Sequence, residues 1–200
     1  MYRWIGLLLL TAALAANGQE SCSESVAEAS PPAAQAAEGQ ALLLAGKGRL
    51  ELDLGKSAVT IARLPEMMIV KFADGATLSH RWMAPSELRE DPYSDLPFVD
   101  FIRLVFRKDV YGASSADRDE ADAVWGAMVS GCINARHYQL FGTDLFTYSQ
   151  TRANGDRYHA FFILDDDVVH YLDIRGDDAL ADYLLATLKK RVRRKSSELY

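Results

Sequence analysis

Cysteine is scarce in this sequence of 200 residues, in which Cys22 and Cys132 are the only two. No C-x-x-C pair and no H-E-x-x-H segment occurs, so the spacings typical of zinc sites are missing. A G-x-S-x-G nucleophile elbow and a phosphate-binding glycine loop are missing as well. We therefore predict no bound metal and no cofactor, and we assign no catalytic residue from the sequence.

Positive charge is also in short supply, with 22 Lys and Arg against 28 Asp and Glu and a net charge of −6. A mildly acidic chain is not built to coat the phosphates of nucleic acid. We therefore expect no nucleic-acid role, and charge favours partners with basic surfaces. One basic run stands near the end of the chain, comprising Lys189, Lys190, Arg191, Arg193, Arg194 and Lys195. We interpret it as the cationic end of a helix, with weak contact to anionic membrane surfaces as the alternative.

Long apolar runs are absent except at the start, where Trp4 to Leu14 follows Arg3. Two A-x-A-like sites follow, at residues 13–15 and 16–18, of the kind that a signal peptidase cleaves. A membrane-spanning helix needs about 20 apolar residues, which is longer than this run. We predict that residues 1–18 are a secretory signal peptide and that the protein is exported, to the periplasm or out of the cell. No transmembrane segment is expected after cleavage.

Export changes the interpretation of the two cysteines, because an oxidising compartment permits a disulfide between Cys22 and Cys132. Such a bond would close a long loop and stabilise the fold by about 4–5 kcal/mol in the chain-entropy model. Gln19 and Glu20 before Cys22 do not match the residues that precede a lipidated cysteine. We therefore expect a disulfide and not a lipid anchor.

Composition divides the exported part into a tether, a domain and a tail. Residues 19–45 are rich in Ala, Glu and Ser with Pro31-Pro32 in the middle and no aromatic residue, which is typical of a flexible tether. Residues 46–195 have the length and the apolar patterning of one domain. Residues 196–200 form a disordered tail in this interpretation.

Alternating apolar residues predict four short antiparallel strands in the first part of the domain. Leu50 to Leu54, Val59 to Ile61, Met67 to Phe72 and Thr77 to Met83 are separated by turn residues, including Asp74-Gly75. Sequence order predicts that the four strands form one meander.

Helical spacing follows in the middle and returns at the end. Phe98, Phe101, Ile102, Val105 and Phe106 make one apolar face after Asp95 and Pro97, and a second helix is expected from Ser115 to near Gly131. A last helix is expected from near Asp177, with an apolar side that reaches Val192. Between the helices, strands are predicted at 145–152, 157–164 and 168–174. The predicted fold class is α+β, with antiparallel sheets from the four-strand meander and a C-terminal hairpin meander, packed with about three helices.

The C-terminal hairpins carry many aromatic residues. If Asn154-Gly155 is a two-residue turn, residues 146, 148, 159, 161 and 163 share one face of the sheet, and residues 145, 147, 158, 160, 162 and 164 share the other. Both faces would then carry large apolar side chains. Either the sheet is covered on both sides, or one face is left exposed as a binding surface.

One polar cluster falls on the second hairpin and is the candidate site. It consists of Arg157, His159, Asp165, Asp166, Asp167, His170 and Asp173, residue types that bind divalent metals or carry out acid–base catalysis. A three-residue turn sets His159 opposite Asp173 and His170 opposite Phe162, whereas a turn of Asp166 and Asp167 sets them opposite Ile174 and Ile163. Since neither register pairs the two imidazoles, the simpler interpretation is a solvated acidic turn.

Three functional hypotheses follow. The first is an exported, non-catalytic binding protein, such as an inhibitor or an immunity-type protein that neutralises a protein partner in the cell envelope. The second is a small envelope hydrolase or metal-dependent enzyme that uses the region of His159, Asp165–Asp167 and His170. The third is a structural envelope component. The first is preferred because catalytic motifs are absent.

Overall fold

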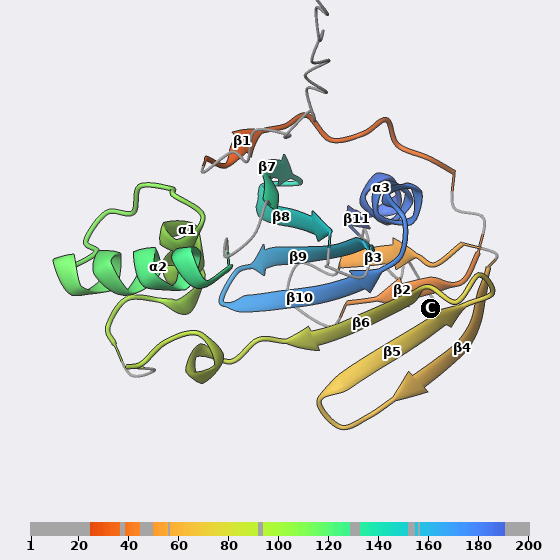
Figure 1. The fold of residues 1–200 in the computed structure, drawn as a ribbon, viewed down its shortest axis with the longest axis horizontal. Helices are drawn as coiled ribbons and strands as arrows, with labels where there is room; N and C mark the ends of the chain where they lie inside the picture. The colour runs from red at the N-terminus through yellow and green to blue at the C-terminus, as the bar shows by residue number, and fades with distance from the viewer. Residues whose placement is uncertain are drawn as a thin grey trace, which may run out of the picture.

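A computed structural model describes residues 25–36, 39–44, 50–55, 57–91, 94–128, 133–151, 155 and 157–190. Two sheets and three α-helices make up this part of the chain, which confirms the predicted α+β class (Figure 1). The predicted signal peptide, both cysteines and the residues from Arg191 onward lie outside the described residues.

The larger sheet has eight strands in the order β1-β7-β8-β9-β10-β6-β5-β4. Its neighbours are antiparallel except for β1 and β7, which are parallel. The strands are β1 (Ala27–Glu28), β4 (Ala58–Arg63), β5 (Met67–Phe72), β6 (Thr77–Trp82), β7 (Ile133–Leu140), β8 (Thr143–Thr151), β9 (Arg157–Asp165) and β10 (Val168–Arg175).

The smaller sheet contains β2 (Ala41–Leu43), β3 (Leu50–Asp53) and β11 (Lys189–Lys190), in the order β11-β3-β2. The first strand of the predicted four-strand meander therefore pairs elsewhere, and β4, β5 and β6 alone form the meander. The alternation around β3 is as predicted, with Leu50, Leu52 and Leu54 fully buried. Sequence order suggested the wrong neighbour, because β3 pairs with β2 and β11 and not with β4. Gly55, with a φ of 69°, directly follows the last buried residue after β3, Leu54.

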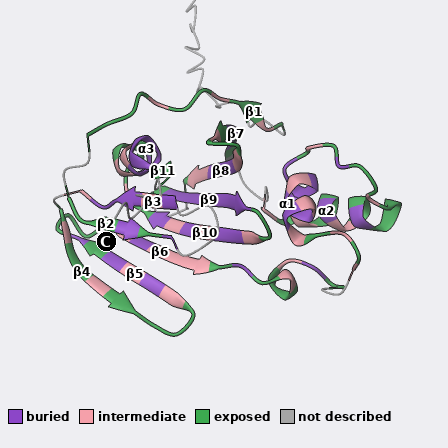
Figure 2. Ribbon diagram, turned by 180° about the vertical axis from the view of Figure 1, so that it is seen from behind, coloured by how far each residue is buried: buried purple, intermediate pink, exposed green. Residues whose placement is uncertain are grey.

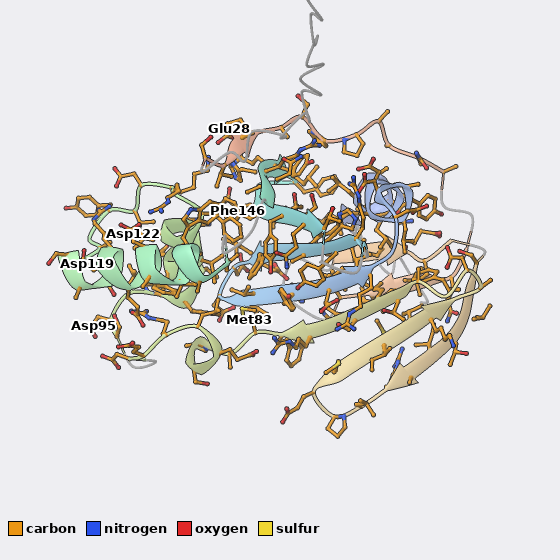
Figure 3. All side chains as sticks on the ribbon, viewed as in Figure 1. Glu28, Met83, Asp95, Asp119, Asp122 and Phe146 are labelled. Carbon is orange, nitrogen blue, oxygen red and sulfur yellow. The ribbon has the colours of Figure 1, made fainter. Side chains whose placement is uncertain are left out.

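Two helices cover one face of the large sheet, which we call the α1 face. They are α1 (Phe98–Val105) and α2 (Ser115–Met128), preceded by a short 3₁₀ turn at Pro85–Glu87. The Phe106 ring stacks on Phe146 of β8 with centroids 4.7 Å apart, and Trp125 of α2 meets Phe106 edge-on at 5.9 Å. Figure 3 labels Phe146 at this junction of helices and sheet. Pro97 directly precedes α1, and Asp95 does not cap it as predicted.

A buried ion pair fixes α2 to the chain before α1. The Arg89 guanidinium, whose side chain is 2% exposed, donates to Asp117 Oδ1 at 2.7 Å and to the Leu96 carbonyl at 2.9 Å. It also lies over the Phe101 ring, 4.6 Å from the centroid. Hydrogen bonds from Ser114 make the largest contribution to lowering the pKa of Asp117. A hydrogen bond from Ser94 and the charge of Arg89 lower it further. The α1 layer is thus joined by charge as well as by aromatic packing.

The other face of the sheet, which we call the α3 face, is covered by the small sheet and by α3 (Asp178–Thr187). Asp177 caps α3 as predicted, since its side chain accepts from the Leu180 N–H at 2.9 Å. The helix ends before the predicted Val192 because Lys189 and Lys190 turn into β11 and pair with β3. These two lysines of the basic run are therefore part of a strand.

Both faces are covered at the centre of the sheet, while its β4 end is open. In Figure 2, β9 and β10 are largely buried and β4 is largely exposed. Of the two alternatives for the aromatic strands, coverage on both sides holds for β8 to β10.

The register between β8 and β9 differs from the expected one. Thr151 pairs with Arg157 and Phe146 with Phe162, so the connection spans residues 152–156 and is not a two-residue turn at Asn154-Gly155. A shift of one residue turns every side chain of β9 to the opposite face. Phe146 therefore shares the α1 face with Tyr158 and Phe162, while residues 159, 161 and 163 share the α3 face with residue 145.

The hairpin of β9 and β10 takes the second of the two registers considered. Asp166 and Asp167 form the turn, His159 pairs with Ile174, and His170 pairs with Ile163. Asp166 has a φ of 54°, a left-handed conformation that Asp tolerates better than most residues.

The structure adds two strands inside the expected tether. β1 pairs with β7, and Glu28 accepts from Lys108 and lies 2.7 Å from Nδ1 of His137 (Figure 3, which labels Glu28). β2 pairs with β3, and Leu42 and Leu44 are buried in the core. The packed part of the chain therefore includes residues before the boundary expected at residue 46.

A buried carboxylate joins the small sheet to α3. Asp53, which is 2% exposed, accepts hydrogen bonds from the N–H groups of Gly39 and Gly55 and from the Tyr183 hydroxyl, the last two at 2.7 Å and 2.6 Å. Three donors on three segments thus depend on one side chain.

Replacement of Asp53 by Ala should lower the free energy of unfolding by about 3 kcal/mol, because three donors on separate segments lose their common acceptor. Chemical denaturation monitored by circular dichroism measures this. Glu51→Ala is the matched control in the same strand: it removes only the 3.0 Å ion pair with the half-exposed Lys189 and should cost less than about 1 kcal/mol. Equal losses for the two variants would contradict the role assigned to Asp53.

Candidate functional site

A half-open pocket of about 150 Å³ lies between the α3 face of the sheet and α3, and we call it the α3 pocket. Three strands and one helix line it. The lining residues are Asn134, Arg136 and Tyr138 of β7, Thr147, Tyr148 and Ser149 of β8, Arg157, His159 and Phe161 of β9, and Asp178, Ala181, Asp182 and Leu185 of α3.

Strand register arranges the sheet wall of the α3 pocket in rows. Asn134 pairs with Ser149, and Ser149 pairs with His159, so these three side chains cross the sheet side by side. In the next row, Arg136 pairs with Thr147 and Thr147 with Phe161. Polar side chains of three strands therefore converge on one patch, although they are far apart in the sequence.

The helix wall comes from one stripe of α3. Asp178, Ala181, Asp182 and Leu185 follow the spacing i, i+3, i+4 and i+7, so they lie on one side of the helix. The apolar members are buried and the two aspartates are exposed at the rim. The pocket thus has an apolar base with charges at its mouth.

Two arginines and two aspartates set the charge of the α3 pocket. Arg157 Nη1 donates to both carboxylate oxygens of Asp178, at 2.7 Å and 2.5 Å. A hydrogen bond with Tyr138 raises the pKa of Arg136, and the nearby charges of Asp182 and Asp178 add to this effect. The four charges cancel, with the cations on the sheet wall and the anions on the helix wall.

His159 is the buried histidine of this lining, with 6% of its surface exposed. Its Nε2 atom lies 3.3 Å from Asp178 Oδ1, yet the geometry is not that of a hydrogen bond, and Nε2 has no hydrogen-bond partner among the described residues. Burial lowers the pKa of His159, and the charge of Asp178 opposes this shift. The imidazole is therefore mainly neutral near pH 7.

The predicted polar cluster divides into separate parts of the structure. Arg157 and His159 enter the α3 pocket, whereas Asp165 and His170 lie toward the other end of the same face, beside the β9–β10 turn. Asp166 and Asp167 are exposed in that turn. Strand alternation places Asp173 on the α1 face, where its carboxylate lies 3.6 Å from Arg175 Nε.

His170 belongs to a buried chain of polar groups that includes a residue left out of the predicted cluster. Its Nδ1 atom lies 3.1 Å from His80 Nε2, and its Nε2 atom lies 3.6 Å from Asp165 Oδ2. Only the pairing of β6 with β10 brings His80 here, so no local sequence signal could have found it.

A metal site was one form of the second hypothesis. In the part of the chain that the structure describes, no group of three or more His, Cys, Asp or Glu side chains is arranged to hold a metal ion. Among the same residues, no helix has both the length and the apolar composition needed to cross a membrane.

Sequence reasoning missed most of the α3 pocket. Ser149, Arg136 and Asp182 stand in no motif, and the expected register of β8 and β9 placed His159 beside the wrong neighbours. The cap at Asp177 did locate the start of α3, and with it the helix wall.

Acid should destabilise the fold through His80. The pKa of this histidine is lowered to about 4, mainly by burial and in addition by the charge of His170. The unfolded chain takes up a proton near pH 6.5, whereas folded His80 stays neutral until about pH 4, so stability falls as the pH falls through this window. His80→Gln should remove about 3 kcal/mol of that loss, since one pKa unit is worth about 1.4 kcal/mol. Urea denaturation of both proteins between pH 7 and pH 4 measures the difference, and parallel curves would contradict it.

Comparison with known proteins does not assign the chain to a family. No protein-family model matches it, and no curated protein matches it. Among solved structures, it is similar to a crystal structure of a protein from Bacteroides thetaiotaomicron VPI-5482, at 10% sequence identity and a TM-score of 0.37. The match covers 78% of this chain and 50% of the other, so the chain spans about half the length of that protein.

Proposed function

We propose that the protein acts after export, in the periplasm or outside the cell, as a non-catalytic binding protein that holds a polar group of its partner in the α3 pocket. The partner is a protein of the cell envelope, and the pocket gives the inhibitor or immunity-type role suggested by the sequence a defined binding site.

One observation carries the proposal: Nε2 of His159, a side chain 8% exposed, lacks a hydrogen-bond partner among the described residues and belongs to the lining of an accessible pocket. Buried polar atoms are almost always hydrogen-bonded, because an unsatisfied one costs about 1–3 kcal/mol. A bound group that reaches Nε2 would remove this cost. Binding is therefore favoured at this position over other polar parts of the described surface.

The surroundings of His159 support recognition of a small polar group. Ser149, Thr147 and Asn134 offer hydroxyl and amide groups along the sheet wall, and Phe161 and Leu185 provide an apolar base. Sites of this kind bind through an apolar contact area and gain specificity from a few placed polar groups.

The test compares capture of envelope proteins by the wild type and by three variants. His159→Phe keeps a ring of similar size and removes Nε2, and Arg157→Gln removes a charge from the rim. Arg175→Gln is the matched control, because this arginine is also exposed and ion-paired but lies outside the α3 pocket.

We expect one partner that is captured by the wild type and by Arg175→Gln and is lost with His159→Phe. Its affinity for Arg157→Gln should fall about tenfold, because Asp178 loses its ion-pair partner and the charge of the rim is no longer balanced. Equal capture by all four proteins, with circular dichroism showing that each is folded, would refute the α3 pocket as the binding site.

A second candidate function is hydrolysis, which a specific arrangement favours. Ser149 pairs directly with His159, and Asp178 lies 3.3 Å from the imidazole. A hydroxyl, a neutral imidazole and a carboxylate that lie next to one another in space are the groups of an activated serine nucleophile. In that reaction the Ser149 hydroxyl would attack an ester carbonyl, His159 would take its proton and pass it to the departing alcohol, and the acyl group would stay on Ser149. Water, giving a proton to His159, would then cleave the acyl group from Ser149 as the acid, and His159 would return that proton to the Ser149 oxygen.

The hydrolysis candidate is tested with 4-nitrophenyl acetate and with a fluorophosphonate label. It predicts ester cleavage above the rate in buffer and a label on Ser149, both lost in Ser149→Ala. Cleavage that persists in Ser149→Ala, or no label on the wild type, would remove this candidate and leave the binding role.

A further inference from the structure

We infer that the group held by the α3 pocket is zwitterionic and about the size of one amino acid, with a carboxylate facing Arg136 and an ammonium facing Asp182. This rests on the proposed function, because it names the chemistry of the group bound at the same site. Three features of the pocket lead to it: its volume, the separation of its charges and the position of His159.

Volume limits the ligand to a few atoms. A cavity of about 150 Å³ is the size that holds a benzene molecule, which has six heavy atoms. A free amino acid with a small side chain, or the single end residue of a longer molecule, has this size. The mouth of the pocket is open, so a larger molecule can place one such residue inside.

Charge separation gives the ligand its two ends. Arg157 is neutralised by its two hydrogen bonds to Asp178, which leaves Arg136 on the sheet wall and Asp182 on the helix wall. These two act on each other through charge, since Asp182 helps to raise the pKa of Arg136, but no ion pair joins them in the part of the chain that the structure describes. A ligand with one positive and one negative group can satisfy both.

Ligands of a single charge fit less well. A phosphate or a simple carboxylate near Arg136 would also face the carboxylates of Asp178 and Asp182, and an amine near Asp182 would face both arginines. Like charges placed together reduce affinity and so give specificity against such ligands. Because the two arginines and the two aspartates of the pocket balance each other, a ligand with no net charge is favoured.

His159 supplies the third contact. Its Nε2 atom has no hydrogen-bond partner among the described residues and sits deeper than the charged rim, with 6% of the residue exposed. A zwitterion that spans Arg136 and Asp182 places its polar atoms over this nitrogen and gives it a partner.

The experiment uses the folded, processed protein and three probes of similar size: alanine carries both charges, alaninamide carries only the ammonium, and propionate carries only the carboxylate. Binding is followed by chemical-shift changes in the NMR spectrum as each probe is titrated. We expect alanine to bind at least about tenfold more tightly than either of the others, since each lacks one charged contact.

Two variants assign the charges. Arg136→Gln should abolish the preference for alanine over alaninamide and leave the preference over propionate, and Asp182→Asn should do the reverse. Arg175→Gln, outside the α3 pocket, should change neither. Propionate or inorganic phosphate binding as tightly as alanine would overturn the inference, and so would the absence of any shift with alanine.

The outcome also separates this inference from the proposed function. If His159→Phe loses the envelope partner while alanine does not bind, the pocket is a binding site with another ligand chemistry. If alanine binds with the expected selectivity but no partner depends on His159, the zwitterion site stands and the protein-binding role falls.

Discussion

Burial of β9 on both faces is the constraint on which the rest of the structure depends. Every residue from Tyr158 to Asp165 is buried, because β9 lies between the α1 layer on one side and α3 with the small sheet on the other. Burial on both sides leaves no face for solvent, so each polar side chain in β9 needs a partner inside the protein. His159 and Asp165 are the two polar residues that this buried stretch turns toward the α3 face, and they mark the two polar sites of that face.

The two buried histidines of that face, His159 and His170, have different surroundings. His170 contacts His80 and approaches Asp165 within the protein, and it is completely excluded from solvent. His159 has a pocket beside it, and its Nε2 atom, like that of His170, has no hydrogen-bond partner among the described residues. The imidazole of His170 is thus enclosed by the protein, whereas that of His159 lines an accessible pocket.

The shape of the α3 pocket depends on parts of the chain that do not line it. Tyr183 is next to Asp182 on α3, and its hydroxyl donates to the buried Asp53 of the small sheet at 2.6 Å. Asp53 also receives the backbone N–H groups of Gly39 and Gly55. The N-terminal segment and the small sheet therefore set the position of the helix wall, which relates stability of the fold to the geometry of the site.

The sequence by itself determined the local structure: α+β class, the apolar faces of the helices, the Asp177 cap and the presence of a turn within Asp165–Asp167. These features depend on neighbouring residues, whose spacing and turn chemistry are visible in the chain. Only the tertiary structure decided which strands pair, because β3 leaves its sequence neighbours for another sheet and a shift of one residue in β8–β9 reverses the faces of β9. The candidate site depends on this strand pairing. Its residues Arg136, Ser149, His159 and Asp182 come from four separate elements, and only long-range pairing and packing bring them together.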